Sequence, residues 1–100
     1  FAGEDKEASA SILKTFVEET TKSNALLEGT LQDDDREQSA KISHKMVPLF
    51  TMLGATSLVE KLRVIEKNAT ILPVEEWKSL LSEVIAEVKK IIKQAMTVSK

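Results

Sequence analysis

The sequence has no cysteine and no tyrosine, and its 100 residues include one histidine, three glycines and two prolines. Without cysteine, the chain can form neither disulfides nor thiolate metal sites. A histidine metal site is also unsupported, because His44 has no second histidine as a partner. The few glycines form no phosphate-binding loop, so nothing indicates ATP binding. We therefore expect no cofactor or metal in this chain.

Long hydrophobic runs are missing as well. The apolar runs are only a few residues long, whereas a membrane-spanning helix needs about 20, and no signal-peptide layout opens the chain. The chain starts at Phe1, so we expect one cytoplasmic domain of a longer protein. The domain itself would not contact a membrane, although the parent protein could be anchored in the inner membrane. The net charge is −2 and no stripe of Lys and Arg occurs, so nucleic-acid binding is not expected.

The pattern that is present is helical. Apolar residues recur with the period of an α-helix, and neither an alternating strand pattern nor an Asn-Gly or Asp-Gly turn occurs. Residues 1–4 are expected to be a linker or added residues. Amphipathic helices with short connections pack most simply as an antiparallel bundle. We predict one all-α domain over residues 1–100, an up-down four-helix bundle and a monomer, with helices at 5–31, 36–53, 58–68 and 73–95.

Several residues mark where these helices start and end. Asp34 and Glu37 have the spacing of a capping box. We favour this helix start over a Ca²⁺ or Mg²⁺ site in the same acidic run, because the spacing of an EF-hand is absent. Gly54 suits a left-handed C-cap. Ser57 and Glu60 have the spacing of a second capping box.

The only histidine is expected to face solvent. Successive helical residues advance by about 100°, which places His44 about 200° from Ile42 around the second helix. A lone histidine is more often structural than reactive, but a residue opposite the core has no packing role. The predicted core face of this helix is formed by Ile42, Met46, Leu49, Phe50 and Leu53.

The surroundings of His44 indicate a docking surface. The projection places Ala40, Val47, Pro48 and Thr51 around it, on a side that is normally polar. An exposed patch of small and apolar residues is typical of a protein-interaction site. The predicted rim of this patch is charged and consists of Glu37, Lys41 and Lys45.

Pro48 is unusual inside a helix. It lacks the N–H that would bond to the carbonyl of His44. The apolar stripe stays in phase on both sides of Pro48, which favours a kinked continuous helix. The alternative is a helix that ends near Val47 and restarts.

The stretch from Ser43 to Ala55, SHKMVPLFTMLGA, resembles the signature of histidine phosphotransfer (HPt) domains. In that signature an exposed His is followed by Lys-Gly at the third and fourth positions after it, and by a second Gly at the tenth. Residues 12–20 resemble the family's first bundle helix, and residues 62–66 the helix after the second glycine. The variant H-K-M-x-P-x-F is similar to HPt domains at the C-termini of some bacterial hybrid sensor kinases.

The sequence departs from the signature at two positions. Val47 stands where the family usually has Lys, and Pro48 where it usually has Gly. Lys41 and Lys45 are the substitutes available as charge partners of a phosphoryl group.

The resemblance implies a phosphorelay in a two-component signalling system. His44 would accept a phosphoryl group from the phospho-aspartate of a receiver domain and pass it to another receiver. Mg²⁺ would belong to the receiver, and the chain would have no kinase activity of its own. Two other readings stay open: a non-catalytic helical adaptor that binds a protein through the patch around His44, and a degenerate HPt-like domain that docks without being phosphorylated.

Overall fold

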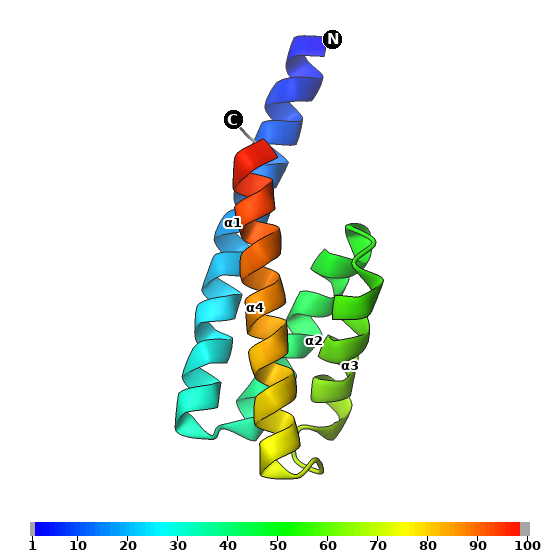
Figure 1. Cartoon of the computed structure of the whole chain (residues 1–100). Helices are drawn as coiled ribbons and strands as arrows, with labels where there is room; N and C mark the ends of the chain where they lie inside the picture. Colours follow the sequence, from blue (N-terminus) through cyan, green and yellow to red (C-terminus); the bar gives the residue numbers. More distant parts are fainter. Residues whose placement is uncertain (1, 99–100) are drawn as a thin grey trace.

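The protein is a bundle of four antiparallel α-helices, seen in a computed structural model that describes residues 2–98, and side chains from residue 12 to residue 95 (Figure 1). The helices run alternately down and up, and no strand occurs within residues 2–98. Helix α1 packs against α2 and α4, and α3 packs against the same two helices. The predicted all-α four-helix bundle is confirmed. Its elements are α1 (Ala2–Asp33), α2 (Arg36–Met52), α3 (Thr56–Asn68) and α4 (Val74–Val98).

Helix α1 is longer than predicted at both ends. It begins at Ala2, so residues 2–4, expected to be a linker, are helical. It also continues without a break through its polar middle, where Thr20 and Asn24 are buried. Asn24 donates a hydrogen bond from Nδ2 to the carbonyl of Ile85, at 3.3 Å. This bond connects α1 to α4 and satisfies the buried amide nitrogen, whereas Asn24 Oδ1 has no hydrogen-bond partner among the described residues.

The turn between α1 and α2 corrects the predicted helix start by one residue. Asp35, not Asp34, is the N-cap, and its side chain accepts a hydrogen bond from the backbone N–H of Gln38 at 3.2 Å. Asp34 has a positive φ of 55°, a left-handed conformation that Asp tolerates. Because Asp34 reverses the chain, the cap passes to the next residue, and Glu37 does not take part in it.

The ends of α2 and α3 also differ in part from the prediction. Gly54 has φ 73°, as expected of a left-handed C-cap. Leu53, predicted to lie in the core, is the C-cap of α2 and is 52% exposed. The capping box predicted from Ser57 is wrong: α3 begins at Thr56 after Ala55, which makes no side-chain cap bond. Pro73 lies just before α4, where its carbonyl accepts from the N–H of Trp77.

Trp77 forms the centre of the lower core, the part of the core at the end of the bundle where the α1–α2 and α3–α4 connections lie (Figure 1). Its side chain is fully buried, and its Nε1–H donates to Ser39 Oγ at 3.0 Å. The Arg36 guanidinium lies 5.6 Å from the centre of the indole ring, within the range of a cation–π contact. Arg36 also donates a hydrogen bond to the carbonyl of Leu72. These contacts join α2, α4 and the α3–α4 connection at one point.

The rest of the core follows the predicted stripes. Ile42, Met46 and Phe50 of α2 are buried, and Leu49 is half-buried. The Phe50 ring meets Phe16 of α1 edge to face, with ring centres 5.8 Å apart. The buried stripe of α4 consists of Trp77, Leu81, Val84, Ile85 and Val88.

An ion pair also joins α3 to α4. Lys61 donates a hydrogen bond to Glu87, and this bond raises the pKa of the Lys61 ammonium above its ordinary value.

Within the described residues, no helix combines the length and the apolar character needed to cross a membrane.

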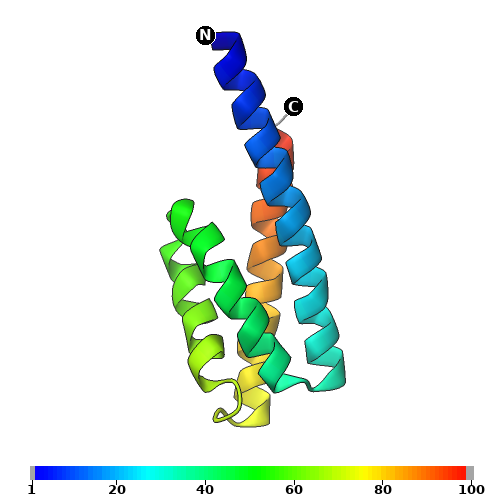
Figure 2. The same ribbon diagram turned by 180° about the vertical axis from the view of Figure 1, so that it is seen from behind.

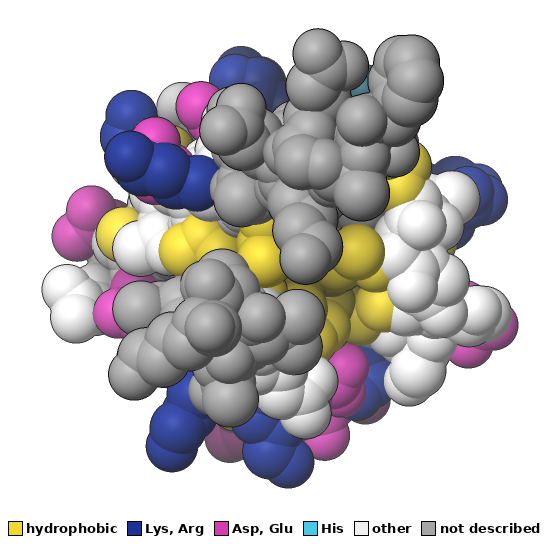
Figure 3. All heavy atoms as spheres, turned by 90° about the horizontal axis from the view of Figure 1, so that it is seen from above, with side chains coloured by type: hydrophobic (Ala, Val, Ile, Leu, Met, Phe, Trp, Pro, Cys, Tyr) yellow, Lys and Arg dark blue, Asp and Glu magenta, His cyan; other side chains and the backbone are white. Residues whose placement is uncertain are grey.

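The end of the bundle at which both termini lie is partly open. Helices α1 and α4 are longer than α2 and α3 and project past the tip of the α2–α3 hairpin (Figures 1 and 2). Hydrophobic side chains are therefore visible from that end (Figure 3). A groove of about 610 Å³ lies between α1 and α2. The apolar side chains that line it are those of Ile12, Leu13, Phe16, Leu49, Met52 and Leu53.

Candidate functional site

His44 lies in the middle of α2 and faces solvent, as its position around the helix predicted. Its side chain is 73% exposed. The opposite face of α2 is anchored in the core by Ile42, Met46 and Phe50. The imidazole is therefore an accessible group on a helix that packing holds in place.

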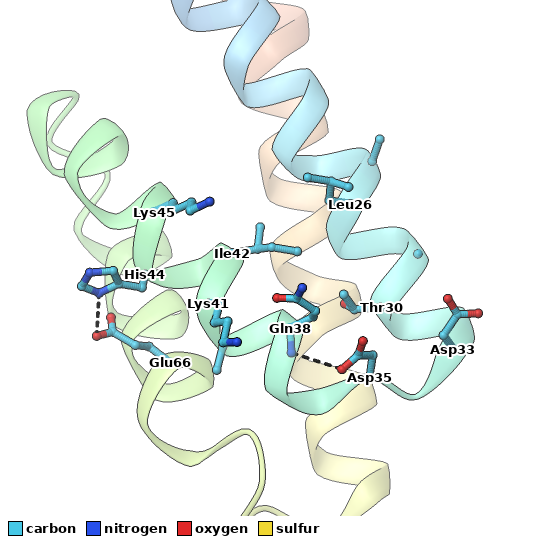
Figure 4. A pocket seen from close by; sticks show the side chains of 13 residues that line it. Leu26, Thr30, Asp33, Asp35, Gln38, Lys41, Ile42, His44, Lys45 and Glu66 are labelled. Carbon is cyan, nitrogen blue, oxygen red and sulfur yellow. Dashed lines mark hydrogen bonds and ion pairs between the residues drawn. The ribbon is translucent and has the colours of Figure 1, made fainter.

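The structure adds a partner that the sequence did not predict. His44 Nδ1 lies 3.0 Å from Glu66 Oε1 of α3, a hydrogen bond between two neighbouring helices (Figure 4). A carboxylate only accepts, so the ring nitrogen must donate. When the ring is neutral, its proton is then on Nδ1, and Nε2 carries the free lone pair. Glu66 thus fixes the tautomer in which Nε2 can act as a nucleophile.

The signal for Glu66 in the sequence was weak. It is separated from His44 by 22 residues, and nothing in the pattern of α3 distinguishes it from other surface carboxylates of the chain. Only the packing of α3 beside α2 brings the two side chains together.

Lys41 and Lys45 are exposed on α2, as predicted, but neither contacts the imidazole ring. In Figure 4 the Lys45 side chain extends toward α1, whereas the His44 ring extends toward Glu66 of α3. Neither lysine forms an ion pair with a described residue. Both ammonium groups are free to turn toward an anion at the ring.

The predicted patch is only partly on the surface. Pro48 and Thr51 are exposed, and Thr51 Oγ1 donates to the carbonyl of Val47 at 2.7 Å. Ala40 and Val47 are half-buried and pack against the core. The projection placed them outside because it considered α2 alone. Glu37 is exposed in the first turn of α2.

Helix α1 contributes to the site, which the sequence did not indicate. A groove of about 840 Å³ runs between α1 and α2 and reaches His44. Leu26 lines it and is 60% exposed. Such an exposed leucine beside a small-residue surface suits a protein contact. We define the His44 face as the set His44, Lys41, Lys45, Pro48, Thr51 and Leu26.

The described part of the chain contains no cluster of three or more His, Cys, Asp or Glu side chains that could hold a metal ion. In the acidic run before α2, Asp35 is the N-cap and Asp34 forms an ion pair with Lys78 at 3.2 Å. These two residues therefore have structural roles at the α1–α2 turn.

Helix α2 is continuous through Pro48, as predicted, and the kink at Pro48 stays a prediction. We expect Pro48→Ala to stabilise the domain, by up to about 3 kcal/mol, because alanine restores the hydrogen bond to the His44 carbonyl and has the higher helix propensity. In the phosphoryl transfer that the family resemblance implies, the same change should slow the reaction by re-aiming the ring. Urea unfolding and a transfer assay measure the two effects. A variant that is more stable and equally fast would show that Pro48 has no part in aiming His44.

Comparison of the chain with models of protein families, with curated proteins and with solved structures found no match. The functional assignment therefore depends on the geometry of the His44 face and on the residues around it.

Proposed function

We propose that this chain is a phosphorelay intermediate of the histidine phosphotransfer type. His44 accepts a phosphoryl group from the phospho-aspartate of one receiver domain and passes it to another. The observation that carries the proposal is the exposure of the His44 ring together with its hydrogen bond: the side chain is 73% exposed, and Glu66 holds the ring through Nδ1. Those are the features that a nucleophile needs in order to enter the active site of a partner.

The chemistry at His44 is simple. The Nε2 lone pair attacks phosphorus, the P–O bond of the acyl phosphate breaks, and its electron pair stays on the receiver's aspartate. Such transfers depend on positioning and charge stabilisation more than on covalent catalysis by the protein. This chain supplies the positioned nucleophile. The Mg²⁺ that assists the reaction belongs to the receiver, so the chain needs no cofactor and has no kinase activity.

The two lysines compensate the charge that arrives with the phosphoryl group. Lys41 and Lys45 lie on the same exposed side of α2 and are unpaired within the described residues. Their long side chains can swing toward a phosphoryl group on Nε2 and form charge-assisted hydrogen bonds. Val47, at the position of the family's usual lysine, is half-buried and cannot take that role.

The receiver docks on the His44 face. Pro48 and Thr51 on α2, and Leu26 on α1 in the groove that reaches His44, provide exposed small or apolar contact area. Contacts of this kind suit a transient protein interface, in which a few residues dominate the affinity. In this proposal the domain works as a cytoplasmic monomer and binds neither nucleic acid nor a membrane.

The test is direct transfer. The domain is incubated with a panel of receiver domains that carry a radiolabelled phosphoryl group, obtained from acetyl phosphate. Label on the domain that is labile in acid and stable in base identifies phosphohistidine, and its passage to a second receiver completes the relay. A domain that binds a receiver but never acquires label is instead an adaptor, a reading that the exposed Leu26 also suits.

The His44 face can be probed with Leu26→Glu and Thr51→Arg. Both side chains are exposed, so the fold should be retained. We expect receiver affinity to fall by about tenfold or more, since truncated or charged anchors cost more than about 1 kcal/mol. Ala40→Glu is a poorer probe, because Ala40 is half-buried.

Calorimetry or surface plasmon resonance measures the affinity. Ser82→Arg, on the exposed side of α4, is the matched control and should bind as well as the wild type. Unchanged affinity in both Leu26→Glu and Thr51→Arg would place the docking surface elsewhere on the bundle.

A further inference from the structure

We propose that Glu66 sets the lifetime of phosphorylated His44 by keeping a proton on Nδ1 after Nε2 has been phosphorylated. The proposal shares one premise with the proposed function, that Nε2 is the atom that takes the phosphoryl group. Glu66 touches the ring and not the phosphorus, so it is a positioning residue.

The chemistry of the N–P bond explains why this proton matters. When water attacks phosphorus, the N–P bond breaks and its electron pair returns to Nε2. If Nδ1 carries a proton, the leaving group is neutral imidazole. If that proton has been lost, the leaving group is the imidazolate anion, which leaves far less readily. The protonated ring is therefore the reactive form, both toward water and toward the aspartate of a second receiver.

The geometry places a carboxylate at the nitrogen concerned. Glu66 Oε1 lies 3.0 Å from His44 Nδ1, and the Glu66 side chain is 30% exposed. A nearby anion that accepts a hydrogen bond favours the charged form of the ring. Because α2 and α3 are adjacent helices, their packing supplies this contact before the phosphoryl group arrives.

Other charges near the ring act less directly. Cations disfavour the protonated ring and carboxylates favour it. Exposed charges that do not touch the ring are screened by salt within about 8–10 Å, whereas Glu66 shares the Nδ1 proton itself. On α2 the charged groups around His44 are Glu37, Lys41 and Lys45, and on α3 they are Arg63 and Lys67 beside Glu66. Asp33 and Asp35 line the groove between α1 and α2 that reaches His44.

The experiment needs no receiver. The domain is phosphorylated with potassium phosphoramidate, phosphorus NMR identifies the Nε2 adduct, and its hydrolysis rate is followed against pH. Three proteins are compared: the wild type, Glu66→Gln, and Glu60→Gln as a control that removes an exposed carboxylate from the same helix. Circular dichroism checks that each remains folded.

We expect Glu66→Gln to move the pH–rate profile to lower pH, because the neutral amide no longer stabilises the protonated ring. Above both midpoints the hydrolysis of the variant is then about two- to fivefold slower, the factor that corresponds to the loss of an exposed ion pair. Below both midpoints every ring is protonated and the rates converge. Glu60→Gln should follow the wild type.

Three results would overturn the proposal: the same profile for Glu66→Gln and the wild type, slowing that persists unchanged at acid pH, or an equal shift in Glu60→Gln. Failure of phosphoramidate to label His44 would overturn it together with the proposed function. Failure of every phosphorylated receiver to transfer to the wild type would count against the proposed function alone, because the hydrolysis profile does not depend on a receiver.

Discussion

His44→Gln is expected to abolish phosphoryl acceptance completely while leaving the fold intact. Glutamine has no nucleophilic nitrogen, so no N–P bond can form. The side chain is 73% exposed, and substitutions at such positions usually change the free energy of unfolding by less than about 0.5 kcal/mol. The loss of the bond to Glu66 falls within this range, because exposed pairs contribute little.

Two measurements belong to this experiment. Transfer from a phosphorylated receiver gives the activity, and urea unfolding followed by circular dichroism gives the stability. Lys45→Gln serves as the matched control, since it changes an exposed neighbour on α2 and should slow transfer without abolishing it. If His44→Gln lost several kcal/mol of stability, His44 would be a structural residue and the phosphotransfer proposal would fail.

Trp77→Ala is expected to cause the largest loss of stability. The indole is fully buried, and removing a buried tryptophan typically costs about 3–5 kcal/mol through lost transfer energy and the cavity that remains. The change also removes the hydrogen bond to Ser39 Oγ and the contact with Arg36. A domain of this size has only about 5–15 kcal/mol of stability in total, so the variant should be marginal.

The comparison with Trp77→Phe separates packing from polar contacts. Phenylalanine keeps much of the buried area but leaves Ser39 without the indole donor, so we expect a smaller loss, of about 1–3 kcal/mol. Because Trp77 is the only tryptophan, unfolding must be followed by circular dichroism. If Trp77→Ala were no less stable than Trp77→Phe, the indole would not be the centre of the lower core.

The caps show where sequence reasoning about local structure failed. The spacing of Asp34 and Glu37 fitted a capping box, yet Asp34 adopts the left-handed conformation of the turn and Asp35 caps α2. Neighbouring aspartates offer the same side chain at successive positions. Which one caps the helix depends on where the chain reverses, and the packing of α1 against α2 determines that point.

The sequence by itself determined the number of helices, the stripes that enter the core and the outward direction of His44. These follow from periodicity, because side chains three and four residues apart share a helix face whatever surrounds the helix. Only the tertiary structure decided which residues meet between helices: Glu66 at the imidazole, Leu26 in the groove, and the half-burial of Ala40 and Val47. Contacts between helices depend on the offset and rotation of one helix against its neighbour, and these arise from the packing of the whole core.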